Sequence, residues 1–255
     1  MEKGDKVLYK NDKKKIIYEI KEFVDEKAHI KGVNYRIYRI VPLEDLLLAK
    51  KDDIEKEEKE SDKYYKNVIN SGKRGKRRYL LGRILHIDGD EMYLEKCLEL
   101  YKSLGVFAEG VRIDEKEMPD RIGYYLDKIN PDIIVITGHD LYNQKGLKDI
   151  ENYANTRYYM ETVRKIRLKK SSYDCCVIAG ACQSNFEALI ASGADFASSP
   201  KRINVHTFDP AVLAIKVAST SFVRLVDIEE ALKYIENGKD AYGGVETLGK
   251  MKLML

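Results

Sequence analysis

The sequence predicts an α/β protein in which a small all-β module precedes a larger domain built on a parallel sheet. Within the first 48 residues, short and partly alternating apolar runs are separated by turn-forming residues, which is typical of β-strands. From Leu80 onward, in a chain of 255 residues, short apolar runs alternate with segments of helical periodicity. This alternation favours a parallel sheet that is covered by helices on both faces.

The N-terminal module, residues 1–49, is expected to be a small barrel of the SH3-like or Tudor-like kind, because several short strands fit into so short a stretch. Residues that favour tight turns separate the strands, for example Asn11-Asp12 and Asp25-Glu26. Pro42 begins the segment that closes the module. The predicted strands are 7–9, 16–20, 28–32 and 35–40.

Residues 50–78 are predicted to be a charged linker between the two parts. From Lys50 to Lys63 the chain is nearly all Lys, Glu and Asp, so it can become ordered only as an exposed helix without a buried stripe. A basic run, Lys-Arg-Gly-Lys-Arg-Arg at 73–78, follows. Proteolytic nicking concentrates in exposed segments of this composition.

The C-terminal domain, residues 79–255, is expected to hold the parallel sheet. Asp209-Pro210 predicts one helix start, because Pro is favoured in the first helical turn behind an Asp cap. The predicted strands are 84–87, 106–111, the run from Pro131 that ends at His139, the run from Tyr173 that ends at Cys182, and 195–198. The predicted helices are 93–104, 122–129, 147–168, 185–192 and 209–217.

The charge balance argues against a nucleic-acid partner. The chain has 45 basic and 42 acidic residues, so its net charge of +3 reflects a highly charged surface and not a basic protein. Nucleic-acid binding requires basic residues gathered on one face. The two basic clusters, 73–78 and 164–170, are interpreted as a linker and a solvated helix face. We therefore expect no specific nucleic-acid partner.

The same bulk features predict a soluble protein of a reducing compartment. No apolar stretch approaches the ~20 residues of a membrane span, so no membrane partner is expected. The charged N-terminus does not match a standard signal peptide. Four cysteines without a disulfide framework or paired metal spacing favour a cytoplasmic location.

Two chemically reactive side chains, His139 and Cys182, each follow a predicted buried strand. Because ligands gather at the carboxyl ends of strands in an open α/β sheet, an imidazole and a thiol placed there can meet in one cleft. A thiolate is a strong nucleophile, and imidazole can accept the thiol proton. The pair therefore predicts a cysteine hydrolase. The other cysteines, Cys97, Cys175 and Cys176, fit small buried apolar residues.

The surroundings of Cys182 predict an activated thiol. Cys182 lies between a strand and a predicted helix, and a helix N-terminus lowers a thiol pKa because its dipole favours the anion. The backbone N–H groups of Cys182 and Asp140 are the candidate donors for a developing oxyanion. Thiolate, imidazole and these donors suffice for hydrolysis, so no metal and no organic cofactor is expected.

Asp88 and Asp90 follow the first strand of the domain. Carboxylates at this edge of the sheet could bind a metal, a phosphate-linked Mg²⁺ or a cationic substrate side chain. Alternatively, Asp90 only caps the following helix.

The motifs around His139 and Ala181-Cys182 resemble those of the caspase-like (clan CD) peptidases, in which one apolar strand leads to the His and the next to an Ala-Cys pair. The resemblance implies a caspase-like or flavodoxin-like arrangement of the parallel sheet. In that clan Gly usually follows the His, whereas here Gly138 precedes it and Asp140 follows it. This departure leaves the second oxyanion donor open.

The β module and four sequence blocks carry a second resemblance. The blocks are Leu85-His86-Ile87-Asp88-Gly89-Asp90, Thr137-Gly138-His139-Asp140, Gly180-Ala181-Cys182-Gln183-Ser184-Asn185-Phe186-Glu187 and Gly243-Gly244-Val245-Glu246-Thr247. With them, the sequence resembles, across nearly the whole chain, the YabG family of sporulation-specific proteases from endospore-forming bacteria. The resemblance implies a cysteine endopeptidase of the mother cell that cuts spore coat and germination-related proteins after Arg or Lys.

Cleavage after a basic residue has two consequences. The specificity pocket needs a buried carboxylate, for which Asp88 and Asp90 are the candidates and Asp195 the reserve. The chain's own basic run at 73–78 becomes a substrate, and the fragment 79–255 is expected to stay folded after that cut.

A rival interpretation is a non-catalytic, receiver-like α/β interaction module. The segments 84–90, 131–135 and 192–196 resemble parts of response-regulator receiver domains. Receivers end their third strand in a phosphoacceptor Asp, whereas this strand ends in Thr137-Gly138-His139. Phosphorelay chemistry is therefore poorly supported, although the fold without the chemistry remains an alternative.

Overall fold

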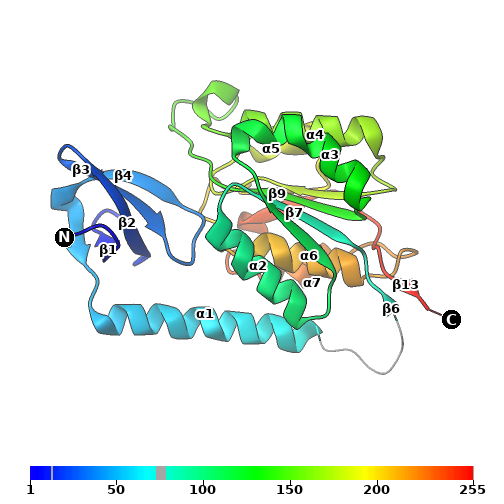
Figure 1. The fold of residues 1–255 in the computed structure, drawn as a ribbon, viewed down its shortest axis with the longest axis horizontal. Coiled ribbons are helices and arrows are strands. Elements are labelled where there is room, and N and C mark those ends of the chain that lie inside the picture. The colour runs from blue at the N-terminus through cyan, green and yellow to red at the C-terminus, as the bar shows by residue number, and fades with distance from the viewer. Residues whose placement is uncertain (13, 73–78, 255) are drawn as a thin grey trace.

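A computed structural model describes residues 1–12, 14–72 and 79–254 and contains two main β-sheets joined by a long helix (Figure 1). The N-terminal sheet is antiparallel, and the C-terminal sheet is mostly parallel with helices on both faces. The predicted α/β class, with an all-β part preceding a parallel-sheet part, is confirmed at this level. The exact domain boundaries stay a prediction.

The N-terminal sheet has the strand order β4-β3-β2-β1-β5. Its strands are β1 (Lys6–Tyr9), β2 (Ile17–Val24), β3 (Lys27–Gly32), β4 (Tyr38–Pro42) and β5 (Leu46–Leu48). Closure into an SH3-like or Tudor-like barrel stays a prediction.

One expected strand of this module begins later than predicted. Residues 35–37 were expected to open the fourth strand, but β4 starts only at Tyr38. Tyr35 instead forms an isolated antiparallel bridge with His206 of the C-terminal domain. The alternating pattern of this segment therefore reflects pairing with a distant part of the chain.

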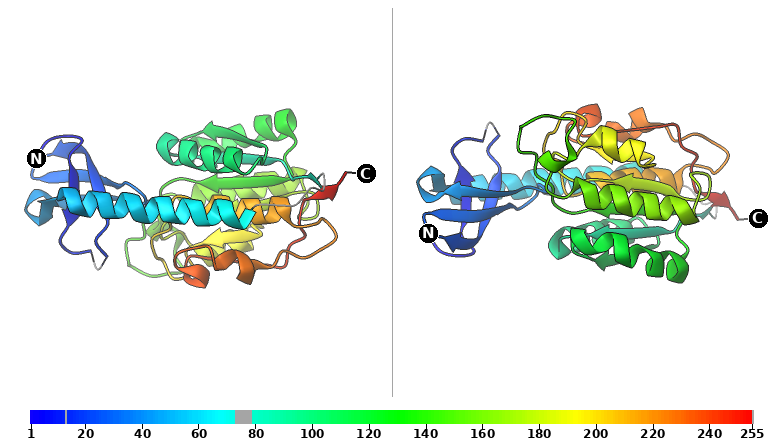
Figure 2. Two further views of the ribbon diagram at one scale, coloured as in Figure 1. Left: turned by 90° about the horizontal axis from the view of Figure 1, so that it is seen from below. Right: turned by 90° about the horizontal axis from the view of Figure 1, so that it is seen from above.

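Much of the predicted linker is the helix α1 (Lys51–Gly72), which runs alongside both parts of the molecule (Figures 1 and 2). The expectation of a helix without a buried stripe covers Lys50 to Lys63, where no side chain is buried. The residues that follow behave differently. Val68 is only 3% exposed, and Tyr64 and Tyr65 pack against the core. These apolar residues follow the charged stretch at helical spacing, so α1 buries one side against the C-terminal domain.

The C-terminal sheet has the order β12-β11-β10-β9-β7-β8, and only its edge strand β12 is antiparallel. In chain order its parallel strands are arranged 2-1-3-4-5, one of the two common doubly wound orders. The strands are β7 (Ile84–Asp88), β8 (Ala108–Arg112), β9 (Ile133–Thr137), β10 (Cys176–Ala179), β11 (Phe196–Ser198) and β12 (Tyr242–Gly244). A separate pair, β6 (Tyr79–Leu80) and β13 (Lys252–Leu253), is antiparallel.

Helices cover both faces of this sheet, because neighbouring strand residues point to opposite sides. Ile84 joins the buried cluster with α2 and α6, whereas Leu85 joins the cluster with α3, α4 and α5. The helices are α2 (Glu91–Ser103), α3 (Met118–Ile129), α4 (Thr156–Lys169), α5 (Phe186–Ala191), α6 (Asp209–Ser219) and α7 (Ile228–Leu232).

Helix α4 starts nine residues later than the predicted start at Leu147. Residues 147–155 instead form a loop with a short 3-10 turn at Ile150–Asn152. Its backbone is satisfied by side chains, since Tyr153 Oη and Asn185 Nδ2 both donate to the Leu147 carbonyl. Tertiary contacts therefore replace the helical hydrogen bonds here.

The N-terminal module and the C-terminal domain share one hydrophobic core. A single buried cluster includes Val7 and Ile30 of the module together with Val212 and Leu213 of α6. The hydrophobic core beside the parallel sheet therefore includes residues that precede position 79. The cluster is continuous because residues of the module and α1 pack directly on the α2–α6 side of the sheet.

Helix α1 is also fixed by a buried polar contact. Tyr64 Oη donates to Asp209 Oδ1 at 2.9 Å, and the backbone N–H of His206 donates to Asp209 Oδ2 at 2.9 Å. Asp209 is fully buried, and burial raises its pKa to about 7 despite these hydrogen bonds. The carboxyl group therefore binds its proton more tightly in the folded protein than in the unfolded chain.

The Asp209→Asn variant should remove one source of pH-dependent stability. Between pH 5 and 7 the unfolded chain has released this proton while the folded protein retains it, so the free energy of unfolding falls as pH rises and levels off above about 7. The contribution from pH 5 to 8 is roughly 2–3 kcal/mol. Urea titrations of both proteins at each pH measure it. Equal pH slopes for the wild type and the variant would contradict the assignment.

Candidate functional site

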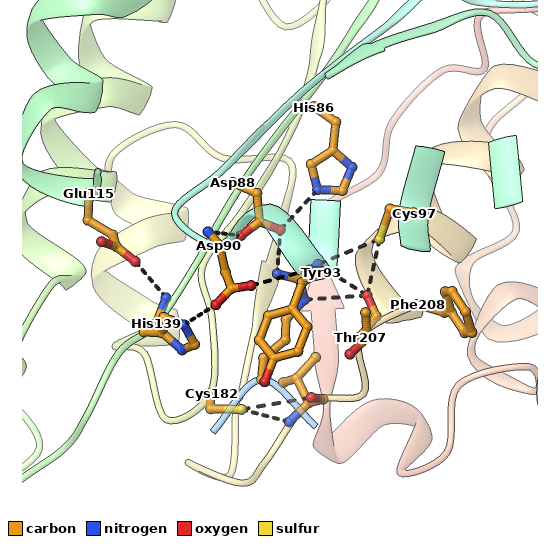
Figure 3. Close-up of polar contacts among 12 residues, drawn as sticks. His86, Asp88, Asp90, Tyr93, Cys97, Glu115, His139, Cys182, Thr207 and Phe208 are labelled. Atoms are coloured by element: carbon orange, nitrogen blue, oxygen red, sulfur yellow. Dashed lines mark hydrogen bonds and ion pairs between the residues drawn. The ribbon is translucent and has the colours of Figure 1, made fainter. Parts of the chain in front are cut away.

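The candidate site lies where β7, β9 and β10 end. These strands are neighbours in the sheet, and the strand order reverses between β7 and β9. In open α/β sheets, ligands bind outside the carboxyl ends of the strands at such a reversal. Asp88 ends β7, His139 follows β9, and Cys182 follows β10. The structure thus brings three of the predicted residues to one edge (Figure 3).

His139 is held in a defined orientation. Its Nε2 lies 3.0 Å from Asp90 Oδ2, and its backbone N–H donates to Glu115 Oε1 at 2.8 Å. Its carbonyl oxygen accepts from Asn155 Nδ2 and Tyr159 Oη. Within the described ranges, His139 Nδ1 is buried and has no hydrogen-bond partner. One ring nitrogen is therefore engaged by a carboxylate, and the other is free for chemistry.

Glu115 is a residue of the site that the sequence did not reveal. A Cβ on Gly138 would lie 2.3 Å from Glu115 Oε1, and one on Gly89 would lie 2.2 Å from the same atom. A larger residue at either position would therefore displace the Glu115 carboxylate from the backbone N–H of His139. The glycines after the two strands are the sequence signal that such a contact exists.

Asp90 has two functions in the structure. Its Oδ1 accepts from the Tyr93 backbone N–H and caps α2, as the alternative interpretation expected. Its Oδ2 contacts His139 and also forms an ion pair with Lys31 of the N-terminal module. Burial by itself would raise the Asp90 pKa, but the hydrogen bonds from His139 and Lys31 lower it below its ordinary value.

Asp88 is fully buried and paired with Arg36 of the N-terminal module at 2.5 Å. Burial would raise the Asp88 pKa, but the Arg36 charge and the His86 hydrogen bond lower it below its ordinary value. The neighbouring His86 is also buried, and burial lowers its pKa. The carboxylate that was expected to bind a substrate cation is thus bound to a cation of the chain itself.

Asp195 lies at the amino ends of the strands, whereas the other candidates lie at the carboxyl ends. It directly precedes β11, and its Oδ2 accepts from the Val177 backbone N–H near the start of β10. It also pairs with Arg167 of α4. Since the other candidates follow the carboxyl ends of their strands, this geometry gives no support for Asp195 in the same cleft.

Cys182 is buried, with 1% of its surface exposed. Its Sγ accepts from the Val205 backbone N–H at 3.2 Å. Burial raises the pKa of the thiol to about 12, so the expected lowering is wrong. The expected helix effect is also absent, because α5 begins only at Phe186 and Cys182 does not lie at its N-terminus.

No hydrogen bond joins the Cys182 thiol to the His139 imidazole in the described part of the chain. The backbone N–H groups of Cys182 and Asp140, the expected oxyanion donors, make no hydrogen bond to any described group. Neither donor is therefore committed to another part of the described chain.

The Asp140 side chain connects the loops that carry His139 and Cys182. Its Oδ2 accepts from Ser184 Oγ at 2.8 Å, and Ser184 Oγ accepts from the Ala181 backbone N–H at 2.9 Å. Thr156 Oγ1 donates to the same carboxylate. The sequence pointed only to the backbone of Asp140, whereas its buried carboxylate fixes the spacing of the two loops.

Other site types are not seen in the described residues. Among residues 1–12, 14–72 and 79–254, no group of three or more His, Cys, Asp or Glu side chains is arranged to hold a metal ion. None of the helices in the described ranges is both long and apolar enough to cross a membrane. In the basic cluster of α4, Lys165, Arg167 and Lys169 pair with acidic side chains. The other basic cluster, 73–78, lies outside the described residues.

Because Cys182 is buried and its thiol pKa is raised, we expect slow alkylation by iodoacetamide at pH 7.5 in the folded protein. Cys97, Cys175 and Cys176 are buried as well and should also react slowly. The same protein in denaturant is the control, in which all four thiols should react rapidly. Peptide mapping by mass spectrometry measures each rate. Rapid labelling of Cys182 alone in the folded protein would contradict the buried resting state.

Comparison with known proteins places this chain in a family. A family model described as YabG peptidase U57 matches residues 2–255. The sporulation-specific protease YabG of Bacillus subtilis (strain 168) is 43% identical over 178 residues, which cover 69% of this chain and 61% of that protein's length. No solved structure matches the chain. On the family match and this identity, the chain belongs to the YabG peptidase U57 family.

Proposed function

We propose that this chain is a cysteine endopeptidase of sporulation, with Cys182 as the nucleophile and His139 as the general base. The observation that carries the proposal is the placement of both residues after adjacent strands, with His139 oriented by Asp90. The family match and the Bacillus subtilis relative, which is named a sporulation-specific protease, support the same conclusion.

In the proposed reaction, His139 Nδ1 accepts the Cys182 thiol proton while the sulfur bonds to the carbonyl carbon of the substrate. The proton then passes to the leaving amine as the C–N bond breaks, and water hydrolyses the resulting thioester. Asp90 stabilises the imidazolium through Nε2, and the free backbone N–H groups of Cys182 and Asp140 bind the oxyanion. Since no hydrogen bond joins thiol and imidazole at rest, the two loops must approach each other during catalysis.

The architecture supports the caspase-like arrangement that the motifs implied. The parallel strands follow the order 2-1-3-4-5, and His139 and Cys182 follow the third and fourth of them. The sixth strand of the sheet, β12, is antiparallel and lies at the edge beside β11.

We further propose that the substrates are spore coat and germination-related proteins, cut after Arg or Lys in the mother-cell cytoplasm. Asp88 is the specificity acid that we retain, because its buried carboxylate already binds a guanidinium group. Asp90 is engaged by His139 and Lys31.

The alternative of a receiver-like interaction module is favoured by one observation. Cys182 is buried, and its thiol pKa is raised to about 12, which is the state of a structural cysteine. The two proposals differ in whether replacement of Cys182 changes any activity.

The Cys182→Ala variant should lose proteolysis of an Arg-containing protein substrate while it keeps its fold. His139→Ala should lower kcat by ~10²–10⁴-fold or more, because proton transfer alone contributes that factor. Cys175→Ala is the matched control, since it removes another buried thiol that lies outside the site. Circular dichroism checks folding. Cleavage by Cys182→Ala at the wild-type rate would exclude the nucleophile assignment and leave the interaction module.

We also propose self-cleavage within the basic run 73–78, which lies outside the described residues. Wild-type protein should lose its intact mass on storage, whereas Cys182→Ala should not. Because the two parts share one core, the fragments should still co-elute at micromolar concentration. Denaturing mass spectrometry beside size exclusion measures both properties. Unchanged intact mass in a wild-type sample that cleaves other proteins would rule out self-processing.

A further inference from the structure

A short segment of the N-terminal module lies against the loop between β11 and α6. Tyr35 bridges to His206 in antiparallel fashion, Arg36 N donates to Val205 O at 3.1 Å, and Thr207 N donates to Asn34 O at 3.1 Å. These two bonds flank an isolated antiparallel bridge at Tyr35, and the chain bends at Asn34 and at Arg36. Peptide substrates are commonly held by this kind of backbone pairing.

The side chain of Arg36 enters a closed pocket beside this pairing. It is 0% exposed, and its guanidinium contacts the Asp88 carboxylate, Cys97 Sγ and the Thr207 carbonyl. The Tyr93 ring lies 5.1 Å from the guanidinium carbon. Figure 3 labels four residues that line this pocket: Asp88, Tyr93, Cys97 and Thr207.

The pocket is next to the proposed nucleophile. Val205 binds Cys182 Sγ through its N–H and Arg36 N through its carbonyl, so one residue connects the thiol to the bound segment. Lys31, on the strand just before the segment, forms an ion pair with Asp90, the partner of His139. A buried basic side chain, a backbone pairing and links to both proposed reactive residues are thus found in one short segment.

We propose that residues 34–36 occupy the peptide-binding groove of the catalytic site as an internal substrate mimic, with Arg36 in the pocket for the basic residue before the cut. This inference rests on the proposed function. The ligand class of the groove is an extended peptide with an arginine side chain, and the backbone of 205–207 is its pairing edge.

The conformation of residues 34–36 is that of a bound inhibitor, because the chain turns back where a substrate would continue. The chain reverses directly after Arg36, since Ile37 N donates to Tyr35 O at 2.8 Å and Gly32 N donates to Ile37 O at 2.8 Å. Tyr93 Oη lies within hydrogen-bond distance of the carbonyl oxygens of Gly32 and Tyr35. An extended substrate continues past the cut, whereas this segment is held in a closed loop.

The first test replaces Arg36 by Ala. If the open groove is populated at 1–10%, removal of the occupant should raise kcat/KM for an Arg-containing fluorogenic peptide ~10–100-fold. Iodoacetamide labelling of Cys182 should accelerate as well. Arg39→Ala is the matched control, because Arg39 binds Asp12 and Tyr18 inside the module. Unchanged kcat/KM and labelling in a folded Arg36→Ala protein would overturn the proposal.

A second test does not depend on Arg36. Tyr35 and His206 form a non-hydrogen-bonded antiparallel pair, where Cα atoms lie ~4.5 Å apart and a disulfide can form. A Tyr35→Cys/His206→Cys protein should lose peptide cleavage and Cys182 labelling when oxidised and regain both when reduced. Wild type given the same oxidant is the control. Equal cleavage by oxidised and reduced protein would overturn the proposal.

The two readouts separate the two proposals. Suppose that the rate of Cys182 labelling falls in the oxidised Tyr35→Cys/His206→Cys protein and rises in Arg36→Ala, while no form cleaves any peptide. The segment then covers the thiol, but the protease assignment fails. If all forms cleave equally and labelling is unchanged, the protease assignment holds and the internal mimic is wrong.

Discussion

The buried ion pair between Arg36 and Asp88 is the interaction on which the arrangement of the candidate site depends. It joins residues that are 52 positions apart, and both side chains are fully buried. Asp88 Oδ1 also accepts from the Asp90 backbone N–H at 2.9 Å, and Asp90 in turn holds His139. Loss of one partner of such a pair costs ~3–5 kcal/mol, because an uncompensated charge stays buried. In this closed state the N-terminal module therefore helps to support the imidazole, and an arginine of a bound substrate would pair with Asp88 in place of Arg36.

The sequence predicted the framework of the domain well because its strands are fully buried. Residues 84–88 and 133–137 are buried on both faces of the sheet, and the polar residues directly after them lie at the carboxyl ends of the strands. Such a pattern depends only on local residues. The β module and the positions of Asp90 and His139 followed from the same reasoning.

The parts that the sequence did not reveal are contacts between distant segments. Arg36 lies in a run whose sequence pattern predicts a strand, and no neighbouring residue indicates that Arg36 pairs with Asp88. Glu115 is indicated only by the glycines that make room for it. The thiol pKa of Cys182 was expected to fall, but it depends on burial beneath other elements, which outweighs the local chain geometry. The buried side of helix α1 was not predicted, because its apolar residues begin where its charged run ends.

Helix α1 has a consequence for how firmly residues 34–36 occupy their groove. The module, α1 and the domain are one covalent chain, with 73–78 as the connection between α1 and β6. A tethered ligand acts at an effective concentration in the millimolar range, whatever the concentration of the protein. A cut within 73–78 would turn the same contacts into a bimolecular complex, whose occupancy falls on dilution. Activity of the cut protein would then depend on the local concentration of the chain in the cell.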